Sequence, residues 1–426
     1  MNANQDVAHQ GYVKKLLILF GLFYFAQAVA QQGGITALPV SLFFKVTMGW
    51  SPAQVEIYTW SLIIPWSIKP LYGMLSDYVP VLGYRRKSWL LLANLLAGFG
   101  FLSLAGYGNE PSLVFWGLCM TAVGTAAADV IVDALMVENG KKYDVTAKLQ
   151  SIQWFWFFVA NIATSLAGGY LCRYFEAETS ATGAITALQI AATIAVAGPL
   201  AVLVATWLIV KEEPQKLDLN HFKQTTGGIW SALKTWPLYA AFLFLAVSNL
   251  SPNLGTPWDY YTLDVLKFKS DQLGWLGACG GVGAAFGAWI YSRHVSKFGI
   301  KKQLLLAITV SVVATLSHVL LVTPHAYTFH LAVVLAAAWG MGGAMVLLAT
   351  LTLAAQCCPS NAEGFTFAIL MSARNLSLKY GSVSGAWLHE NKLDKNIVSL
   401  ILLSAACTAV CYLLVPLMRT AQNSGK

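Results

Sequence analysis

Apolar runs of about 20 residues recur along the whole chain, and each is long enough to cross the roughly 30 Å hydrocarbon core of a bilayer. Of the 426 residues, 57% are hydrophobic and 11% are charged, whereas soluble domains carry about 25% charged residues. We therefore expect an all-α polytopic membrane protein with about 12 transmembrane helices. The expected spans are Lys14–Leu38, Ala53–Asp77, Ser88–Tyr107, Ser112–Met136, Leu149–Leu171, Ala184–Val210, Trp236–Tyr260, Gln272–Tyr291, Gln303–Val322, Phe329–Ala355, Glu363–Leu388 and Ile397–Leu417.

The positions of lysine and arginine predict which side of the membrane each loop faces. If both termini are cytoplasmic, the inner loops hold roughly three times as many cations as the outer loops. The reverse topology would invert this bias, so we expect a multi-pass protein with cytoplasmic termini. The first apolar run is too long for a cleaved signal and lacks a small-residue cleavage site. The net charge of +8 is scattered over short loops and does not indicate nucleic-acid binding.

The seven cysteines form no disulfide or metal-binding pattern. Isolated cysteines in apolar runs usually act as small hydrophobic residues. No nucleophile–base pair or metal-ligand spacing is visible, and the acids inside the expected spans have no histidine nearby. The sequence therefore predicts no enzymatic activity, no cofactor and no metal site.

A long polar interval follows the sixth expected span and divides the chain. It predicts a cytoplasmic linker, 211–235, between an N-terminal half, 1–210, and a C-terminal half, 236–426. Each half has about six helices, and the segment Gly73–Lys87 after the second span is echoed by Gly287–Lys302 after the eighth. Two pseudo-symmetric halves around a central site are the arrangement expected of alternating access.

The segment between the second and third spans is short and charged. Asp77 is expected to end one helix, and Gly83 to permit a turn. Three consecutive cations then open the next helix, which is also what an ordinary cytoplasmic loop would show. The acid and the glycine before it favour a gating loop that holds two helices in one state. The expected gating residues are Lys69, Gly73, Asp77, Arg85, Arg86 and Lys87.

The fourth span carries Asp129 and Asp133, which lie four residues apart and therefore on one helical face. Two close carboxylates in a low dielectric do not both stay ionised without a cation, so one is a candidate proton carrier. The alternative is a structural clamp with Lys69. That lysine lies about 12 Å inside its span, at a depth that matches Asp129.

In the eleventh span, Arg374 lies about 16 Å from the helix start, near the membrane midplane. A guanidinium at this depth is rarely left unpaired, and its planar fork suits the carboxylate of a bound anion. A bridge to Asp129 or Asp133 is the alternative, and both pairings can hold at different stages of a cycle. Lys379 is shallower and can extend toward the outer surface.

Amides and aromatic rings occur on several other spans. A flat heteroaromatic ligand requires rings for stacking and amides for hydrogen bonds, although lipid contact and helix packing are common alternatives. Asn249 belongs to a seventh span that prolines and asparagines interrupt, either to line a cavity or to pack as a kink. The expected substrate-binding residues are Gln27, Gln31, Asp129, Asp133, Gln153, Trp154, Asn249, Arg374 and Asn375, with Asp129 and Asp133 also coupling protons.

Four segments carry a family resemblance: Lys69–Pro80, Gly83–Lys87, Asp129–Glu138 and Cys358–Asn375. Together they resemble signatures of the folate-biopterin transporter family, which belongs to the major facilitator superfamily. The resemblance implies a secondary transporter of folates or pterins with a cavity between its halves for the pterin ring. Proton coupling is commonly inferred for such carriers, so symport is expected.

The implied partners are a small molecule (folate or a pterin) and protons, within a lipid bilayer and with no nucleic acid. A monomer in the inner membrane of a bacterial cell is expected. A muropeptide-permease-like or acetyl-CoA-transporter-like carrier of another organic anion is the alternative, because those relatives share the lysine before the gating loop and the paired aspartates. The segment Cys358–Asn375 favours the folate-biopterin family. A transporter-shaped sensor is a further alternative, although the chain shows no sizeable soluble domain.

Overall fold

The computed structural model describes residues 3–31, 34–143, 145–215, 236–358 and 363–418. Within these ranges, 10 helical stretches are long and apolar enough to cross a membrane. They match ten of the expected spans. Of the other two, the second is divided into short helices, and the eleventh contains Arg374 and Lys379, whose charges lower its hydropathy.

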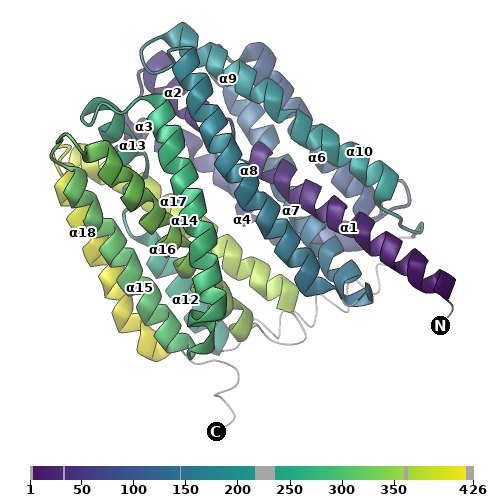
Figure 1. Cartoon of the computed structure of the whole chain (residues 1–426). Helices are drawn as coiled ribbons and strands as arrows, with labels where there is room; N and C mark the ends of the chain where they lie inside the picture. Colours follow the sequence, from purple (N-terminus) through teal and green to yellow (C-terminus); the bar gives the residue numbers. More distant parts are fainter. Residues whose placement is uncertain (1–2, 32–33, 144, 216–235, 359–362, 419–426) are drawn as a thin grey trace. The chain divides into compact units, whose positions relative to one another are not determined.

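The chain forms two compact units, and the first comprises Met1–Thr47 and Ile68–Leu219. Its helices are α1 (Ala3–Ala30), α2 (Ala37–Leu42), η1 (Phe43–Thr47), α5 (Lys69–Tyr78), α6 (Arg86–Tyr107), α7 (Pro111–Tyr143), α8 (Thr146–Tyr174), α9 (Ala181–Ala195) and α10 (Ala197–Ile209). α1 packs against α8 and α10, and α6 packs along α7 (Figure 1). The buried side chains of Phe20, Phe23 and Ile131 form part of its core.

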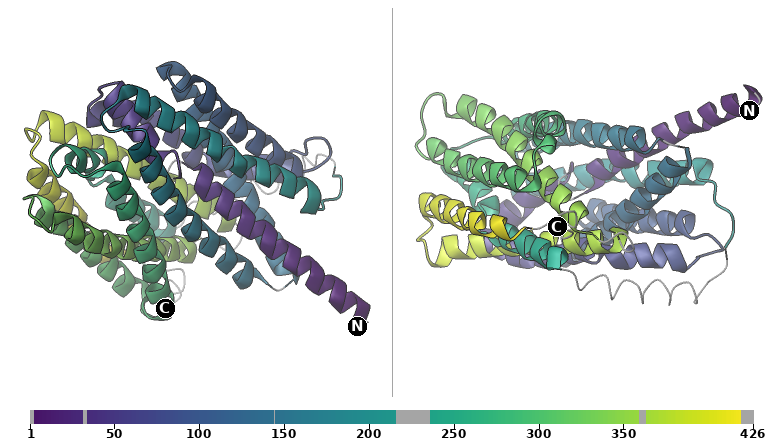
Figure 2. Two further views of the ribbon diagram at one scale, coloured as in Figure 1. Left: turned by 45° about the horizontal axis from the view of Figure 1, so that its top comes forward. Right: turned by 90° about the horizontal axis from the view of Figure 1, so that it is seen from below.

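The second unit comprises Met48–Ser67 and Asn220–Lys426. Its helices are α3 (Pro52–Tyr58), η2 (Thr59–Ile63), α4 (Ile64–Ser67), α12 (Trp236–Leu250), α13 (Gly255–Asp264), α14 (Ser270–Arg293), η3 (Val295–Lys297), α15 (Ile300–Ser317), η4 (His318–Leu321), α16 (Thr328–Cys357), α17 (Glu363–Asn391), α18 (Ile397–Val410) and η5 (Cys411–Leu417). α12 packs against α17, and α15 packs against α18 (Figure 2). Phe244, Leu304 and Leu353 lie in its core.

Glycine residues allow α14 and α16 of the second unit to pack with their backbones in contact. A Cβ atom added to Gly283 of α14 would lie 1.9 Å from the carbonyl oxygen of Ala337 in α16. A Cβ atom on Gly340 of α16 would lie 1.9 Å from the carbonyl oxygen of Gly280 in α14. Small residues allow membrane helices to approach until their backbones touch, so only glycine fits these two positions.

Residues 48–67, which we call the strap, pack in the second unit although the chain on both sides of them belongs to the first. The expected span 53–77 is therefore not one continuous helix. Its path includes the 3-10 turn η2, and Ile68 (φ −99°, ψ 20°) interrupts the helix before α5. Pro70 follows in the first turn of α5, and it has no N–H group to donate to the carbonyl of Trp66, four residues earlier.

The predicted interruption of the seventh span is confirmed. α12 ends at Leu250 and α13 begins at Gly255. The backbone N–H of Asn253 donates to the carbonyl of Gly381 in α17 at 3.1 Å, and a Cβ atom on Gly381 would lie 2.6 Å from the carbonyl oxygen of Ser251. The break is thus packed against a glycine of α17, which satisfies part of the backbone that the interruption frees.

The boundary between the two units in the second half of the chain falls at Leu219–Asn220. Most of the expected linker 211–235 lies outside the described residues. The division into halves 1–210 and 236–426 therefore stays a prediction. In the first span, α1 ends at Ala30, and the remainder of the expected run Lys14–Leu38 includes the start of α2.

Candidate functional site

Asp129 of α7 lies at the centre of a polar cluster in the first unit. Lys69, at the start of α5, forms a salt bridge with Asp129 Oδ2 at 2.5 Å. The amide nitrogen of Gln27 in α1 donates to Asp129 Oδ1 at 2.6 Å. Asp129 is 7% exposed, so this pair lies largely away from solvent. The clamp between Lys69 and Asp129, which their matched depths suggested, is present.

Asp133 lies one helical turn from Asp129 and accepts a hydrogen bond from the hydroxyl of Tyr24 in α1. Tyr24 is buried, and the rings of Trp154 and Phe157 in α8 meet it edge-on, with centroids 6.1 and 6.3 Å away. Two carboxylates, one ammonium group and two neutral donors therefore meet among α1, α5 and α7.

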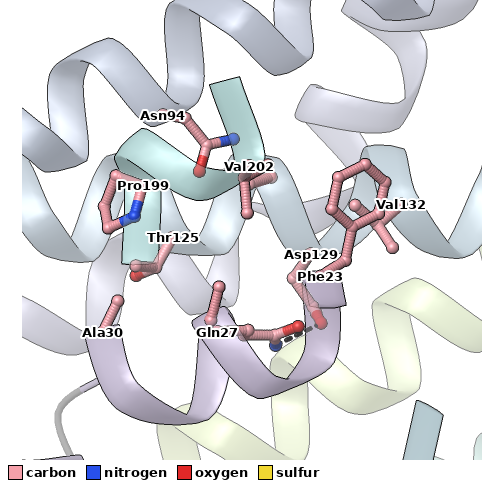
Figure 3. A pocket seen from close by; sticks show the side chains of 11 residues that line it. Phe23, Gln27, Ala30, Asn94, Thr125, Asp129, Val132, Pro199 and Val202 are labelled. Atoms are coloured by element: carbon pink, nitrogen blue, oxygen red, sulfur yellow. Dashed lines mark hydrogen bonds between the residues drawn. The ribbon is translucent and has the colours of Figure 1, made fainter. Parts of the chain in front are cut away.

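A small cavity adjoins this cluster between α1, α6, α7 and α10, and Figure 3 shows its lining. Its volume of about 20 Å³ is enough for one water molecule. Asn94 donates its amide to Leu90, and Thr125 donates its hydroxyl to Thr121. The oxygen atoms of Asn94 and Thr125 therefore remain available as acceptors beside Asp129.

Three other expected binding residues of the first unit lie outside the lining of this cavity. Gln31 follows the last residue of α1, and its backbone N–H donates to the carbonyl of Gln27 at 2.8 Å. Gln153 is 1% exposed, and its amide nitrogen has no hydrogen-bond partner among the described residues. Trp154 belongs to the aromatic group around Tyr24. Their roles in substrate binding stay predictions.

The predicted gating loop brings its charges together at the junction of α5, α6 and α7. Arg86 Nη2 lies 2.8 Å from Asp77 Oδ1 and 2.8 Å from Glu138 Oε1. Gly83 occupies the turn with φ +83°, a conformation that favours glycine. The side chain of Arg86 is 8% exposed, so its charge depends on these two acids. Sequence reasoning found Asp77 but gave Glu138 no role.

Glu212 caps the first turn of α6, although the sequence assigned it only to the linker. Its carboxylate accepts the backbone N–H groups of Arg85, Arg86 and Lys87 at 3.2, 3.1 and 2.9 Å. An acid at this position satisfies donors that have no partner within the helix and interacts favourably with the helix dipole. Gly73, another expected gating residue, lies in α5 beside α7. A Cβ atom added to it would lie 3.6 Å from Cγ1 of Val130.

In the second unit, Arg374 of α17 lines a cavity of about 50 Å³ together with Asn249 of α12. Ser248, Ser311 and Thr408 contribute hydroxyl groups to the same cavity. Within the described part of this unit, Arg374 forms no hydrogen bond or ion pair with another residue. The expected pairing of Arg374 with Asp129 or Asp133 stays a prediction.

Asn375, the neighbour of Arg374, binds the strap instead: its amide nitrogen donates to the carbonyl of Trp66 at 3.2 Å. One turn further along α17, Lys379 forms an ion pair with Glu56 of the strap. Sequence reasoning gave Glu56 no role, because its partner Lys379 lies 323 residues away in the chain.

Comparisons with known proteins agree with this architecture. A solved D-xylose-proton symporter superposes with a TM-score of 0.73, over 95% of this chain and 97% of that one, at 14% identity. A nucleoside transporter, NupG, gives 0.71 at 12% identity over 95% of this chain and 99% of that one. These likenesses show that the protein has the major facilitator fold. Together with the 10 apolar helical stretches of the described residues, this fold makes it a multi-pass membrane protein.

Among curated proteins, the chain is 29% identical to a folate-biopterin transporter of Synechocystis, over 90% of this chain and 78% of that protein. It is 26% identical to the probable folate-biopterin transporter 4 of Arabidopsis thaliana, over 88% of this chain and 90% of that protein. These relatives are transporters rather than enzymes. The profile of the BT1 family matches residues 29–423, and the chain therefore belongs to the BT1 family.

Proposed function

We propose that this protein moves folate or a related pterin across the inner membrane by alternating access, coupled to protons. The names of its relatives support the substrate class, and the major facilitator fold supports alternating access. We further propose a monomer with two pseudo-symmetric halves and both termini in the cytoplasm.

The observation that carries the proton coupling is the cluster around Asp129. Two carboxylates and one lysine leave one excess negative charge if all three groups are ionised. Ionisable groups within a membrane are costly unless they are paired or hydrated. When Lys69 pairs with Asp129, a proton on Asp133 completes the neutralisation, and the hydroxyl of Tyr24 stays within reach of the same carboxyl group.

Arg374 supplies the complementary charge for the substrate. A guanidinium with no acid in its own cavity gains most from an anion that enters with the ligand, and folate carries carboxylates that fit its planar fork. The cavities beside Asp129 and Arg374 are each too small to enclose a pterin ring. We propose that their polar groups serve coupling and recognition and that the two cavities form only part of the binding site.

The coupling is tested in proteoliposomes that take up radiolabelled folate under an imposed proton gradient. The wild type is expected to accumulate folate when the outside is acidic, whereas Asp133→Asn equilibrates folate without responding to the gradient. Glu110→Gln, which removes an exposed acid from the turn before α7, is the matched control. If Asp133→Asn and Asp129→Asn both keep gradient-driven accumulation with the wild-type pH dependence, the coupling scheme is wrong.

The substrate class is tested separately by thermal stability in detergent with folate, biopterin, a muropeptide and acetyl-CoA. Stabilisation by folate or biopterin, together with counterflow of labelled folate in the same liposomes, is expected. Stabilisation by the muropeptide or acetyl-CoA alone would identify a carrier of another organic anion. Binding of folate without counterflow would indicate a sensor.

A further inference from the structure

Two polar side chains of α17 hold the ends of the strap. The carboxylate of Glu390 accepts hydrogen bonds from the hydroxyl of Ser51 and the backbone N–H of Ala53, both at 3.0 Å. At the other end of the strap, the amide of Asn375 donates to the carbonyl of Trp66 at 3.2 Å. These contacts span almost the full length of residues 48–67.

An ion pair holds the middle of the strap to the same helix. The ammonium group of Lys379 contacts the carboxylate of Glu56 and donates to the hydroxyl of Thr59 at 2.9 Å. The hydroxyl of Thr256, in α13, donates to the other oxygen of Glu56 at 2.5 Å. Glu56 is 7% exposed, so its charge is neutralised almost entirely by protein groups.

The strap is not one continuous α-helix. It contains a 3-10 turn in its middle, and the helix is interrupted at Ile68, where the chain enters the first unit. At the other end it joins the first unit after Thr47. Any relative movement of the two units therefore pulls on both ends of the strap, and the contacts with α17 must resist or release it.

A charged contact suits a reversible attachment better than a permanent one. Apolar side chains of similar size would often hold two buried surfaces together at least as stably, because burying two charges costs desolvation energy. An ion pair, however, forms only when the strap and α17 are correctly aligned. When the pair separates, water can solvate both charged groups. Glu56 lies near the middle of the strap and Lys379 lies in α17, so their ion pair is placed to control release of the strap from α17.

We propose that Glu56 and Lys379 are positioning residues for transport: their ion pair latches the strap to α17, and every transport cycle opens and re-forms it. The latch rests on the proposed transport activity, but it requires neither folate as the substrate nor proton coupling. It adds two residues, from opposite ends of the sequence, to those expected to control the conformational cycle.

The first test is hydrogen–deuterium exchange of the purified, substrate-free protein. Glu56→Gln and Lys379→Gln are each expected to speed exchange of strap amides by about tenfold or more, because local opening becomes easier. The exchanged pair, Glu56→Lys with Lys379→Glu, is expected to return exchange toward the wild-type rate. Glu110→Gln is the matched control. Unchanged exchange in the single variants would overturn the latch.

The second test is counterflow of labelled folate by the same variants. Each single variant is expected to slow counterflow by about tenfold, while the exchanged pair recovers and folate still raises the thermal stability of all of them. Wild-type counterflow in the single variants, or equal losses in the single and exchanged variants, would overturn the proposal. Asn375→Ala, which removes one uncharged contact, gives a milder version of both measurements if a charge variant fails to fold. If folate neither binds nor exchanges in the wild type, the substrate proposal fails, and the exchange measurement still decides the latch.

Discussion

The polar cavity of the first unit and the polar cavity of the second differ in how their charge is satisfied. In the first, one oxygen of the Asp129 carboxylate forms a salt bridge with Lys69, and the other accepts a hydrogen bond from Gln27. In the second, Arg374 meets hydroxyl groups and Asn249 but no acid of its own unit among the described residues. The first, third, fourth and sixth spans line the first cavity, and the seventh and the ninth to twelfth spans line the second.

Under the proposed proton coupling, this difference separates the binding of protons from the binding of the ligand. The cluster of the first unit has one carboxylate more than it has cations, so it can bind and release a proton without a ligand while its lysine and neutral donors hold the carboxylates in place. A guanidinium without an acid is incomplete until an anion arrives, which makes it sensitive to the ligand. Under the proposed function, we therefore expect the first unit to serve ion coupling and the second unit to serve ligand recognition.

Removing the guanidinium is expected to give the largest effect. Arg374→Ala should weaken folate binding by about a hundredfold, because the carboxylate of folate loses its charged partner. Arg374→Lys should recover only part of this loss, since an ammonium group lacks the planar fork. Titration calorimetry measures both, with the exposed Arg293→Ala as the control. An equal loss for biopterin, which has no carboxylate, would break the comparison.

Breaking the pair of Lys69 and Asp129 should lower the free energy of unfolding, and replacing both residues should lower it less than replacing Lys69 alone. Lys69→Met leaves Asp129 buried without its cation and should cost about 3 kcal/mol of unfolding free energy. Adding Asp129→Asn should recover most of that cost, because the pair is then removed as a whole. Thermal unfolding compares the variants with the exposed Lys148→Met. Additive losses would show that the two residues do not neutralise each other.

A smaller effect is expected at the gating loop. Asp77→Asn should slow counterflow by about threefold to tenfold, since Arg86 keeps its contact with Glu138. Equilibrium binding of folate should remain close to that of the wild type. Loss of binding with unchanged conformational exchange, followed by a fluorophore on the α5–α6 loop, would contradict the gating role.

The smallest effect is expected at Gly73. A methyl group there would lie 3.6 Å from Val130 Cγ1, an ordinary contact, and alanine favours helix more than glycine does. Gly73→Ala should therefore change counterflow by less than about twofold. Gly340→Ala, where a backbone carbonyl blocks the methyl group, provides the contrast. A tenfold loss from Gly73→Ala would show that α5 and α7 come closer in another state of the cycle.

Features with a local pattern could be predicted from the sequence. Hydropathy identified the spans, prolines and asparagines identified the break after α12, and matched depths suggested the pair of Lys69 and Asp129. Each of these follows from residue type and distance along one helix. The interruption at Ile68 was missed, because an apolar run gives no measure of helical continuity.

Contacts between distant helices could not be predicted in the same way. Glu56 and Lys379 are 323 residues apart, so neither residue indicates the other. Tyr24 lies in an aromatic stretch typical of a lipid-facing surface, and only the fold turns its hydroxyl toward Asp133. Glu212 lies in a polar segment where acids are common, and its role depends on α6 beginning beside it.

The glycine contacts between α14 and α16 have a mechanical consequence. Because the backbones of these two helices touch, we expect α14 and α16 to move together as one rigid pair. Bending within the second unit is then expected where helices are interrupted, between α12 and α13 and along residues 48–67. In this unit, glycine contacts are thus expected to mark the rigid part, and interruptions of helical hydrogen bonding are expected to mark the parts that bend.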